Sequence, residues 1–354
     1  MNEKTEIAEV VETKLANEGA NAMNEIEFVG HDIGFGDNKV AAGNYSQGIF
    51  KLFKFPSAVA PVSQTEYFQD SRVISMGDKT YYVGDDAMRV ETSLIQDVVE
   101  YKHLEEFQPL FIHYVLRSLG CNDKNYPKYY VLGLSVAHIQ NSGYFKQKAE
   151  NYFKVMGWNT KVIVLPQGAG VKVAHDAYGT SFPKMPDDFV GAASNFLIAD
   201  LGFNTLDVIH VLNGKLTPTN VRGIPNKGVV VLAARLHAHI NKVYGMSYSV
   251  KEVKEFLDLG YMKVRGKTIP LTEPIAQFKK DYLALLEQIM EKEFGSIMNK
   301  VEYVLLSGGG AYFFSNHVKG DQFYHTPATH SEYYNAIGYF EQAKKTFLAE
   351  PKPV

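Results

Sequence analysis

The sequence of 354 residues has little cysteine, little tryptophan and no long apolar run. Its one cysteine, Cys121, excludes an intrachain disulfide and favours a reducing cytoplasm, and we expect its thiol to be a small buried hydrophobe. No apolar stretch approaches the ~20 residues that cross a bilayer. Residues 1–24 lack the basic start and apolar core of a secretory signal. The sequence therefore predicts a cytoplasmic protein with no membrane contact.

An excess of either charge is also missing. The chain has 36 Lys and Arg against 39 Asp and Glu, which gives a formal net charge of −3. Such a balance provides no large positive field for DNA, so a role on DNA would need a partner that makes the contact. The 45% of apolar residues is normal for a globular protein, and the length suits two domains.

The order of apolar runs and turn formers predicts an α/β protein. Strands are expected within residues 25–32, 48–60, 72–87, 128–137, 160–166, 194–202 and 206–219, and a strand, glycine turn and helix within 301–314. Helices are expected within residues 91–119, 142–157, 249–260, 272–294 and 331–345. A strand that runs into an acidic glycine turn and a hairpin occurs twice, about half the chain apart. This repetition suggests two related domains that face each other.

Two segments look separate from these domains. Residues 1–24 are rich in Glu and have no aromatic residue, which favours a flexible acidic tail. A short helix that docks on a neighbour remains an alternative, because Ile7, Val10 and Leu15 follow helical spacing. Residues 179–191 contain two prolines and several turn formers, so they are the best candidate for a linker.

The stretch GHDIGFGDNKV, residues 30–40, has the composition of a phosphate-binding loop. Phosphates need backbone N–H groups that approach closely, and glycine leaves room for that approach. Gly34 and Gly36 would admit the phosphates, and Lys39 would meet the terminal oxygens. Asp32 would hold the water shell of Mg²⁺, an ion that dehydrates reluctantly. A simple tight turn is the alternative, and the pattern is neither a P-loop nor a dinucleotide fingerprint.

A second turn, DLGFNTLD at residues 200–207, repeats this pattern. Asp200 and Gly202 correspond to Asp32 and Gly34, so two such turns on facing domains would grip one triphosphate. Thr205 could donate a hydrogen bond to that ligand. Asp207 would either position Thr205 or simply pair across the hairpin.

Two further turns follow strands. Gly308, Gly309 and Gly310 would leave room for a flat base or ribose, although a close structural contact would also explain them. Gln167, in VLPQGAG at 164–170, would orient an attacking water, since glutamine is no strong base. An exposed turn glutamine is the alternative.

Taken together and in order, these motifs resemble the actin and sugar-kinase superfamily. The matching strings are Asp-x-Gly-x-Gly-x-x-Lys at 32–39, Asp-x-Gly-x-Asn-Thr-x-Asp at 200–207, the turn at 166–170, Ser-Gly-Gly-Gly at 307–310, and Asn335, Ala336 and Gly338 of the final connecting motif. FPS at 55–57, YYVGDDA at 81–87 and NAIG at 335–338 look most like bacterial and plasmid actin-like ATPases of the ParM type. The resemblance covers roughly residues 26–345.

The resemblance implies an actin-like fold of two related α/β domains with mixed sheets facing a central nucleotide cleft. Domain I would comprise residues 25–185 and 330–354, and domain II residues 186–329. Asp32 and Asp200 would hold Mg²⁺ through water, and Gln167 would act with them in catalysis. The residues implied in nucleotide binding are Gly34, Phe35, Gly36, Asp37, Asn38, Lys39, Gly202, Phe203, Asn204, Thr205, Lys227, Gly308, Gly309 and Gly310.

The implied function is a filament-forming ATPase that assembles head to tail and segregates plasmid DNA through a small DNA-binding adaptor. A bacterial cytoskeletal scaffold is a close alternative that no residue pattern separates from it. A small-molecule kinase of the same superfamily would need a catalytic carboxylate over a substrate pocket. A chaperone-like switch would need a substrate-binding region after the nucleotide domain. ATP is the expected nucleotide, and GTP remains open.

Overall fold

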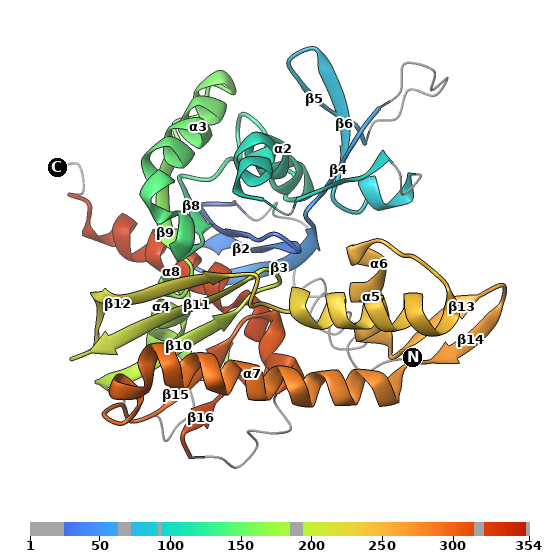
Figure 1. The fold of residues 1–354 in the computed structure, drawn as a ribbon. Coiled ribbons are helices and arrows are strands. Elements are labelled where there is room, and N and C mark those ends of the chain that lie inside the picture. The colour runs from blue at the N-terminus through green and yellow to red at the C-terminus, as the bar shows by residue number, and fades with distance from the viewer. Residues whose placement is uncertain are drawn as a thin grey trace.

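Two mixed sheets of five strands form the framework of the protein in the computed structural model, which describes residues 25–62, 72–90, 94–98, 100–184, 194–314 and 322–351 (Figure 1). The first sheet has the order β3 (Gly48–Pro56), β2 (Asp37–Asn44), β1 (Phe28–Ile33), β8 (Tyr129–Leu134) and β9 (Lys161–Pro166). The second has the order β12 (Lys215–Pro225), β11 (Thr205–Leu212), β10 (Asn195–Leu201), β15 (Val304–Ser307) and β16 (Tyr324–His325).

The two sheets share one topology. In each, the first three strands in sequence are joined by antiparallel pairing, and the first strand then pairs in parallel with a later one. The hairpin between β11 and β12 turns at Asn213 and Gly214, which both have positive φ, as a tight Asn-Gly turn requires. The prediction of two related α/β domains with mixed sheets is therefore confirmed.

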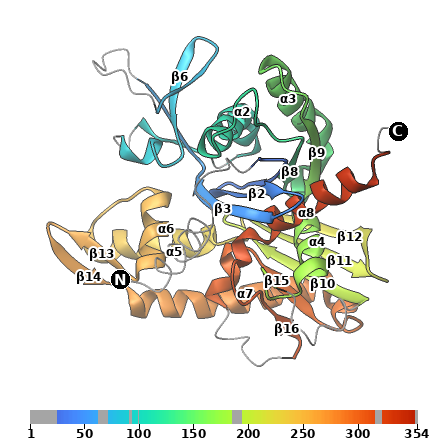
Figure 2. The same ribbon diagram turned by 180° about the vertical axis from the view of Figure 1, so that it is seen from behind.

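Helices separate and cover the sheets in layers (Figures 1 and 2). Helices α4 (Ala169–Tyr178) and α8 (Tyr334–Ala349) lie between the sheets and share a hydrophobic core with both. The outer face of the first sheet packs on α2 (Tyr101–Ser118) and α3 (Ser142–Val155), and that of the second on α5 (Val230–Tyr244) and α7 (Thr272–Met298), with α6 (Val250–Leu259) beside α5. None of the helices in the described ranges is long and apolar enough to cross a membrane.

We call each five-stranded sheet with its covering helices a unit, the first built around β1 and the second around β10. Each unit also carries a small additional sheet. On the first unit, β4 (Ala58–Pro61), β5 (Ile74–Met76), β6 (Lys79–Val83) and β7 (Gln96–Asp97) form four strands with their own small core. On the second, β13 (Tyr261–Val264) and β14 (Lys267–Pro270) form a hairpin beside α6. In Figure 1 these additions project from the same side of the molecule, above and below.

Most predicted elements are present, with several differences. Helix α4 and the hairpin of β13 and β14 lie outside the predicted ranges, and so does strand β2, whose residues are polar at the start and small afterwards. After Gly308 the chain forms only a 3₁₀ turn, Gly309–Phe313, in place of a longer helix. Helix α6 begins with a capping box, since Ser249 Oγ accepts from the N–H of Glu252 and the Glu252 carboxylate accepts from the N–H of Ser249.

Some predictions stay untested. The acidic tail at 1–24 lies outside the described residues, as does most of the proposed linker, which is described only as far as residue 184. The division into residues 25–185 with 330–354, and 186–329, stays a prediction, although α8 does pack on β1 and β2 of the first sheet.

The junction between the sheets contains a histidine that predicts acid sensitivity. His175 of α4 is 3% exposed and packs on Phe196 and Tyr303, and burial lowers its pKa to about 4. Because the folded-state pKa lies below the ordinary 6.5, the unfolded chain takes up the proton first as the pH falls. The contribution of His175 to the free energy of unfolding is therefore fully present above pH 6.5 and is lost as the pH falls toward 4. The total loss is about 3 kcal/mol.

The test compares wild type with His175→Leu, which cannot take up this proton. Between pH 7.5 and pH 5, the free energy of unfolding of wild type should fall by about 2 kcal/mol more than that of the variant. Urea denaturation at both pH values measures the difference. Parallel pH profiles for the two proteins would show that His175 is not responsible.

Candidate functional site

Two aspartates occupy equivalent places at the ends of the central strands. Asp32 lies on β1 and Asp200 on β10, and both are at most 5% exposed. Lys39 is the direct cross-strand neighbour of Asp32, and their side chains approach to 3.8 Å between Nζ and Oδ2. Asp207 is the corresponding neighbour of Asp200. Alternation along the strands thus presents three carboxylates and one lysine to the space between the two units.

The two Asp-x-Gly turns, the glutamine turn and the glycine turn meet around one cavity between the units. Within the described chain its lining consists of Asp32, Gly34, Phe35, Gly36, Lys39, Gln167, Asp200, Gly202, Phe203, Asn204, Thr205, Gly308, Gly309 and Glu332. All except Glu332 belong to the predicted set. Segments up to 300 residues apart in the sequence therefore converge on one place, from Asp32 to Glu332.

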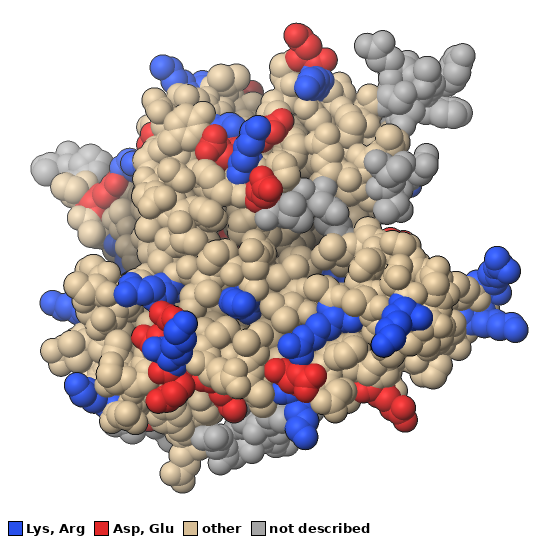
Figure 3. Space-filling view, in the orientation of Figure 1, with Lys and Arg blue, Asp and Glu red and all other residues tan. Residues whose placement is uncertain are grey.

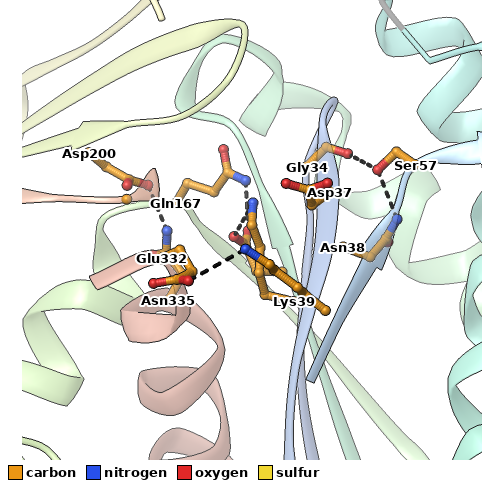
Figure 4. Close-up of polar contacts among 12 residues, drawn as sticks. Gly34, Asp37, Asn38, Lys39, Ser57, Gln167, Asp200, Glu332 and Asn335 are labelled. Atoms are coloured by element: carbon orange, nitrogen blue, oxygen red, sulfur yellow. Dashed lines mark hydrogen bonds and ion pairs between the residues drawn. The ribbon is translucent and has the colours of Figure 1, made fainter. Parts of the chain in front are cut away.

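Gln167 is fixed beside Asp32. It follows β9 and immediately precedes Gly168, the N-cap residue of α4. Its Nε2 donates to Asp32 Oδ1 over 2.7 Å, and its side chain is 9% exposed (Figure 4). Because the amide nitrogen is engaged, the other end of the amide, Oε1, is the acceptor that remains for a ligand or a water molecule.

The opposite aspartate is fixed by the helix between the sheets. Asn335, in the first turn of α8, donates from Nδ2 to Asp200 Oδ2 over 2.6 Å. Its Oδ1 accepts from the N–H groups of Gly168 and Val171, at 2.8 and 3.3 Å. One asparagine thus ties the glutamine turn to Asp200. The sequence marked Asn335 as part of a connecting motif and did not place it at the site.

Asp207 joins the two units. Its carboxylate accepts from Thr205 Oγ1 at 2.9 Å on its own hairpin, and from Ser135 Oγ at 2.9 Å and Val136 N–H at 3.1 Å on the other unit. Both expectations for Asp207 hold, because it contacts Thr205 and also pairs across the hairpin with Asp200, and in addition it holds the turn after β8. Ser135 carries no local sequence signal beyond that of an ordinary serine at the start of a 3₁₀ turn.

The electrostatics of the cavity favour a cation. Burial raises the pKa of Asp32 despite Lys39 and Gln167, and burial with the neighbouring charges of Asp32 and Asp207 raises the pKa of Asp200 to about 7. Burial likewise raises the pKa of Asp207 to about 6. Grouped carboxylates of this kind ionise more readily when a metal ion neutralises them.

Mg²⁺ fits this donor set. No group of three His, Cys, Asp or Glu side chains in the described ranges is placed to hold a metal directly. Mg²⁺ typically keeps several waters and binds one or two carboxylates together with substrate phosphates, and two facing carboxylates provide that arrangement. Asp32 and Asp200 would hold it through water.

Four residues predicted to bind nucleotide do not line the cavity. Asp37 pairs with Lys254 of α6 at 2.5 Å, an ion pair between the units, and Asn38 is turned into the first unit. Lys227 lies outside the lining, and its carbonyl accepts from Tyr282 Oη. Gly310 is buried against Leu201 and Val229. Distant packing, invisible in the local motif, determines these four positions.

Gly308 is required by packing as well as by the cavity. Its φ is +85°, and a Cβ there would lie 2.5 Å from Asp200 Oδ1. Gly309 has space around it, since the nearest atom to its hypothetical Cβ is 3.9 Å away on Glu332. The alternative of a close structural contact therefore accounts for Gly310 and applies to Gly308 as well, although Gly308 and Gly309 both line the cavity.

Comparisons with known proteins agree with this architecture. The family model described as the actin-like proteins N-terminal domain matches residues 30–170, and the model described as the archaeal actin homologue MreB-like C-terminal domain matches residues 198–320. No curated protein matches the chain. The two matched ranges contain every residue of the cavity lining except Glu332.

Solved structures share the fold over nearly their whole length. ParM in a 15-stranded filament from Clostridium botulinum is 18% identical with a TM-score of 0.68, over 91% of this chain and 99% of that one. An archaeal actin homologue in complex with ADP is 16% identical with a TM-score of 0.66, over 90% and 99%. Bacillus thuringiensis ParM with ATP is 15% identical with a TM-score of 0.62, over 92% and 100%. From both matched domains and the shared fold, the chain belongs to the actin-like proteins.

Proposed function

We propose that the protein is an ATPase that binds ATP with Mg²⁺ in the cavity between its two units and assembles head to tail into filaments. The observation that carries the proposal is the cavity itself, where two equivalent Asp-x-Gly turns from topologically identical units face each other beside Lys39 and Gln167. The ATP, ADP and filament named for the structurally similar proteins support the same function for this chain.

Each turn has a role in this proposal. Backbone N–H groups around Gly34, Gly36 and Gly202 bind phosphate oxygens, and Lys39 neutralises the terminal phosphate. Asp32 and Asp200 hold the hydrated cation from opposite units. Mg²⁺, when bound, supplies charge neutralisation to the phosphates during transfer.

Gln167 orients the attacking water in this proposal. Its amide nitrogen is held by Asp32, so its Oε1 is fixed in the cavity as an acceptor for a water proton. Glutamine cannot remove that proton as a strong base. Its contribution is therefore orientation, the role that a glutamine has in other nucleotide hydrolases.

The proposal also covers how the protein assembles into a filament and what the filament moves. A head-to-tail contact is heterologous, so it propagates into a filament when its rotation does not close. We propose a cytoplasmic filament that moves plasmid DNA through a DNA-binding adaptor. The net charge of −3 supports the need for an adaptor, as does Figure 3, where the described Lys and Arg side chains of that face are interspersed with Asp and Glu.

Light scattering of the purified protein tests the core of the proposal. On addition of Mg²⁺-ATP the signal should rise and later decay, whereas Mg²⁺-ADP should give no lasting rise. A flat trace with ATP at high protein concentration would contradict filament formation. Phosphate release measured in the same sample separates a protein that hydrolyses without assembling from one that does neither.

Gln167→Ala should separate binding from hydrolysis. The variant should bind Mg²⁺-ATP with nearly unchanged affinity and release phosphate about 100-fold more slowly, because the water loses its orienting acceptor. Filaments of the variant should consequently persist longer. Phosphate release is the measurement, and a rate equal to that of wild type would remove Gln167 from the mechanism.

A further inference from the structure

A buried line of polar side chains runs behind the first phosphate loop. Tyr130 Oη lies 2.7 Å from His31 Nδ1, and His31 Nε2 lies 2.8 Å from Asn38 Oδ1. Asn38 Nδ2 donates to Ser57 Oγ at 2.8 Å, and Ser57 Oγ donates to the carbonyl of Gly34 at 2.5 Å. Each of the four side chains is fully buried.

The hydrogen bonds of this chain have one direction. His31 is fully buried and both of its ring nitrogens contact neutral groups, the Tyr130 hydroxyl and the Asn38 amide, so the imidazole is neutral and carries one proton. The carbonyl of Asn38 can only accept, so that proton is on Nε2 and Nδ1 accepts from the Tyr130 hydroxyl. Every donor therefore points from Tyr130 toward Gly34, and the last acceptor is the loop backbone.

This chain of hydrogen-bonded side chains lies on the opposite side of the strands from the cavity. His31 precedes Asp32 on β1, and Asn38 precedes Lys39 on β2, so alternation puts the first of each pair behind the sheet and the second in the cavity. Figure 4 shows Ser57 between Asn38 and Gly34, away from Gln167 and Asp200. None of the four side chains reaches a ligand in the cavity.

The contact at Gly34 determines how the loop presents its backbone. In a trans peptide the carbonyl and the following N–H point in opposite directions. Ser57 Oγ holds the Gly34 carbonyl on its own side, which directs the Phe35 N–H to the other side. The Ser57 N–H holds the Gly36 carbonyl at 3.0 Å in the same way. Ser57 thus fixes two peptide units of the loop that lines the cavity.

We infer that Ser57, Asn38, His31 and Tyr130 act as a chain of positioning residues that aims loop N–H groups at the phosphates of the nucleotide. The inference rests on the proposed function, since it assigns the donors that a bound phosphate would meet. The chain is effective as a unit, because loss of any member frees the next side chain to rotate and leaves the carbonyl of Gly34 without a fixed donor.

Affinity for Mg²⁺-ADP, measured by calorimetry, tests the inference. Ser57→Ala should weaken binding about tenfold, and Tyr130→Phe, which removes only the first hydroxyl of the chain, about threefold. The double variant should bind no more weakly than Ser57→Ala, since the chain is already broken. A merely structural role would make the two losses independent. Additive losses would therefore overturn the inference.

A matched control separates positioning from general loss of stability. Gln108→Met removes another buried hydrogen bond of the first unit, to the carbonyl of Phe145, and should lower the melting temperature with no change in ADP affinity. If Ser57→Ala fails to fold, wild-type affinity in Tyr130→Phe would still overturn the inference. Absence of ADP binding in wild type would overturn the proposed function as well, whereas equal binding by wild type and folded Ser57→Ala would overturn this inference alone.

Discussion

Replacement of Asp200 by asparagine is expected to lower Mg²⁺-dependent ATP turnover by about 100-fold. The substitution keeps the shape of the side chain, and its Oδ1 can still accept from Asn335, so the fold should survive. What it removes is the negative charge that, in the proposed function, holds the hydrated cation from the second unit. Phosphate release measured over a series of Mg²⁺ concentrations should show a lower maximum rate and a higher requirement for the metal.

The control for this variant is a buried carboxylate that lies outside the cavity. Glu341 of α8 is 8% exposed and accepts a hydrogen bond from Tyr178 Oη. Glu341→Gln should therefore change stability and leave the Mg²⁺ dependence of turnover as in wild type. Wild-type turnover by Asp200→Asn at every Mg²⁺ concentration would refute the assignment of Asp200 to the metal.

Gly338→Val should be among the most damaging single substitutions for the fold. Helices α4 and α8 cross so closely that a Cβ at Gly338 would lie 1.8 Å from the carbonyl oxygen of Gly170. Neither backbone can move without disturbing the hydrogen bonds of Asn335 between them. We expect a loss of about 3 kcal/mol or more in the free energy of unfolding, measured by urea denaturation, and a matching loss of soluble protein.

The same substitution at an open site is the comparison. Gly143, near the start of α3, has no atom within 4 Å of a hypothetical Cβ. Gly143→Val should thus change the free energy of unfolding by less than about 0.5 kcal/mol. Equal losses for the two variants would mean that the helix crossing is not the cause.

The features that sequence could predict are those encoded by neighbouring residues. The Asp-x-Gly turns after β1 and β10 follow from an apolar strand that ends in turn formers, and the hairpin at Asn213 and Gly214 has its own signature. Because the two turns repeat, the meeting of two units around one cavity could also be anticipated. These signals are local, so they do not depend on how the chain packs elsewhere.

What sequence could not predict depends on contacts between distant segments. Ser135 and Lys254 carry no special signal in the sequence. Ser135 gains its role from Asp207 of the second unit, and Lys254 gains its role from Asp37 of the first unit. The sequence does not predict where the Asn38 side chain lies, because its glycine turns favour a loop that extends through residue 40, whereas β2 begins at Asp37. Once residues 37–44 form a strand, alternation turns Asn38 away from the ligand side.

Asn335 has a consequence for how the protein is made. The carboxylate of Asp200 and the turn that carries Gln167 depend on an asparagine in the last helix of the fold, which emerges from the ribosome after both of them. A nascent chain that has completed both central strands still lacks the residue that aligns them. Until α8 has been synthesised, Asp200 and the glutamine turn therefore lack the hydrogen bonds that hold them together, so the proposed nucleotide site cannot be complete before that point.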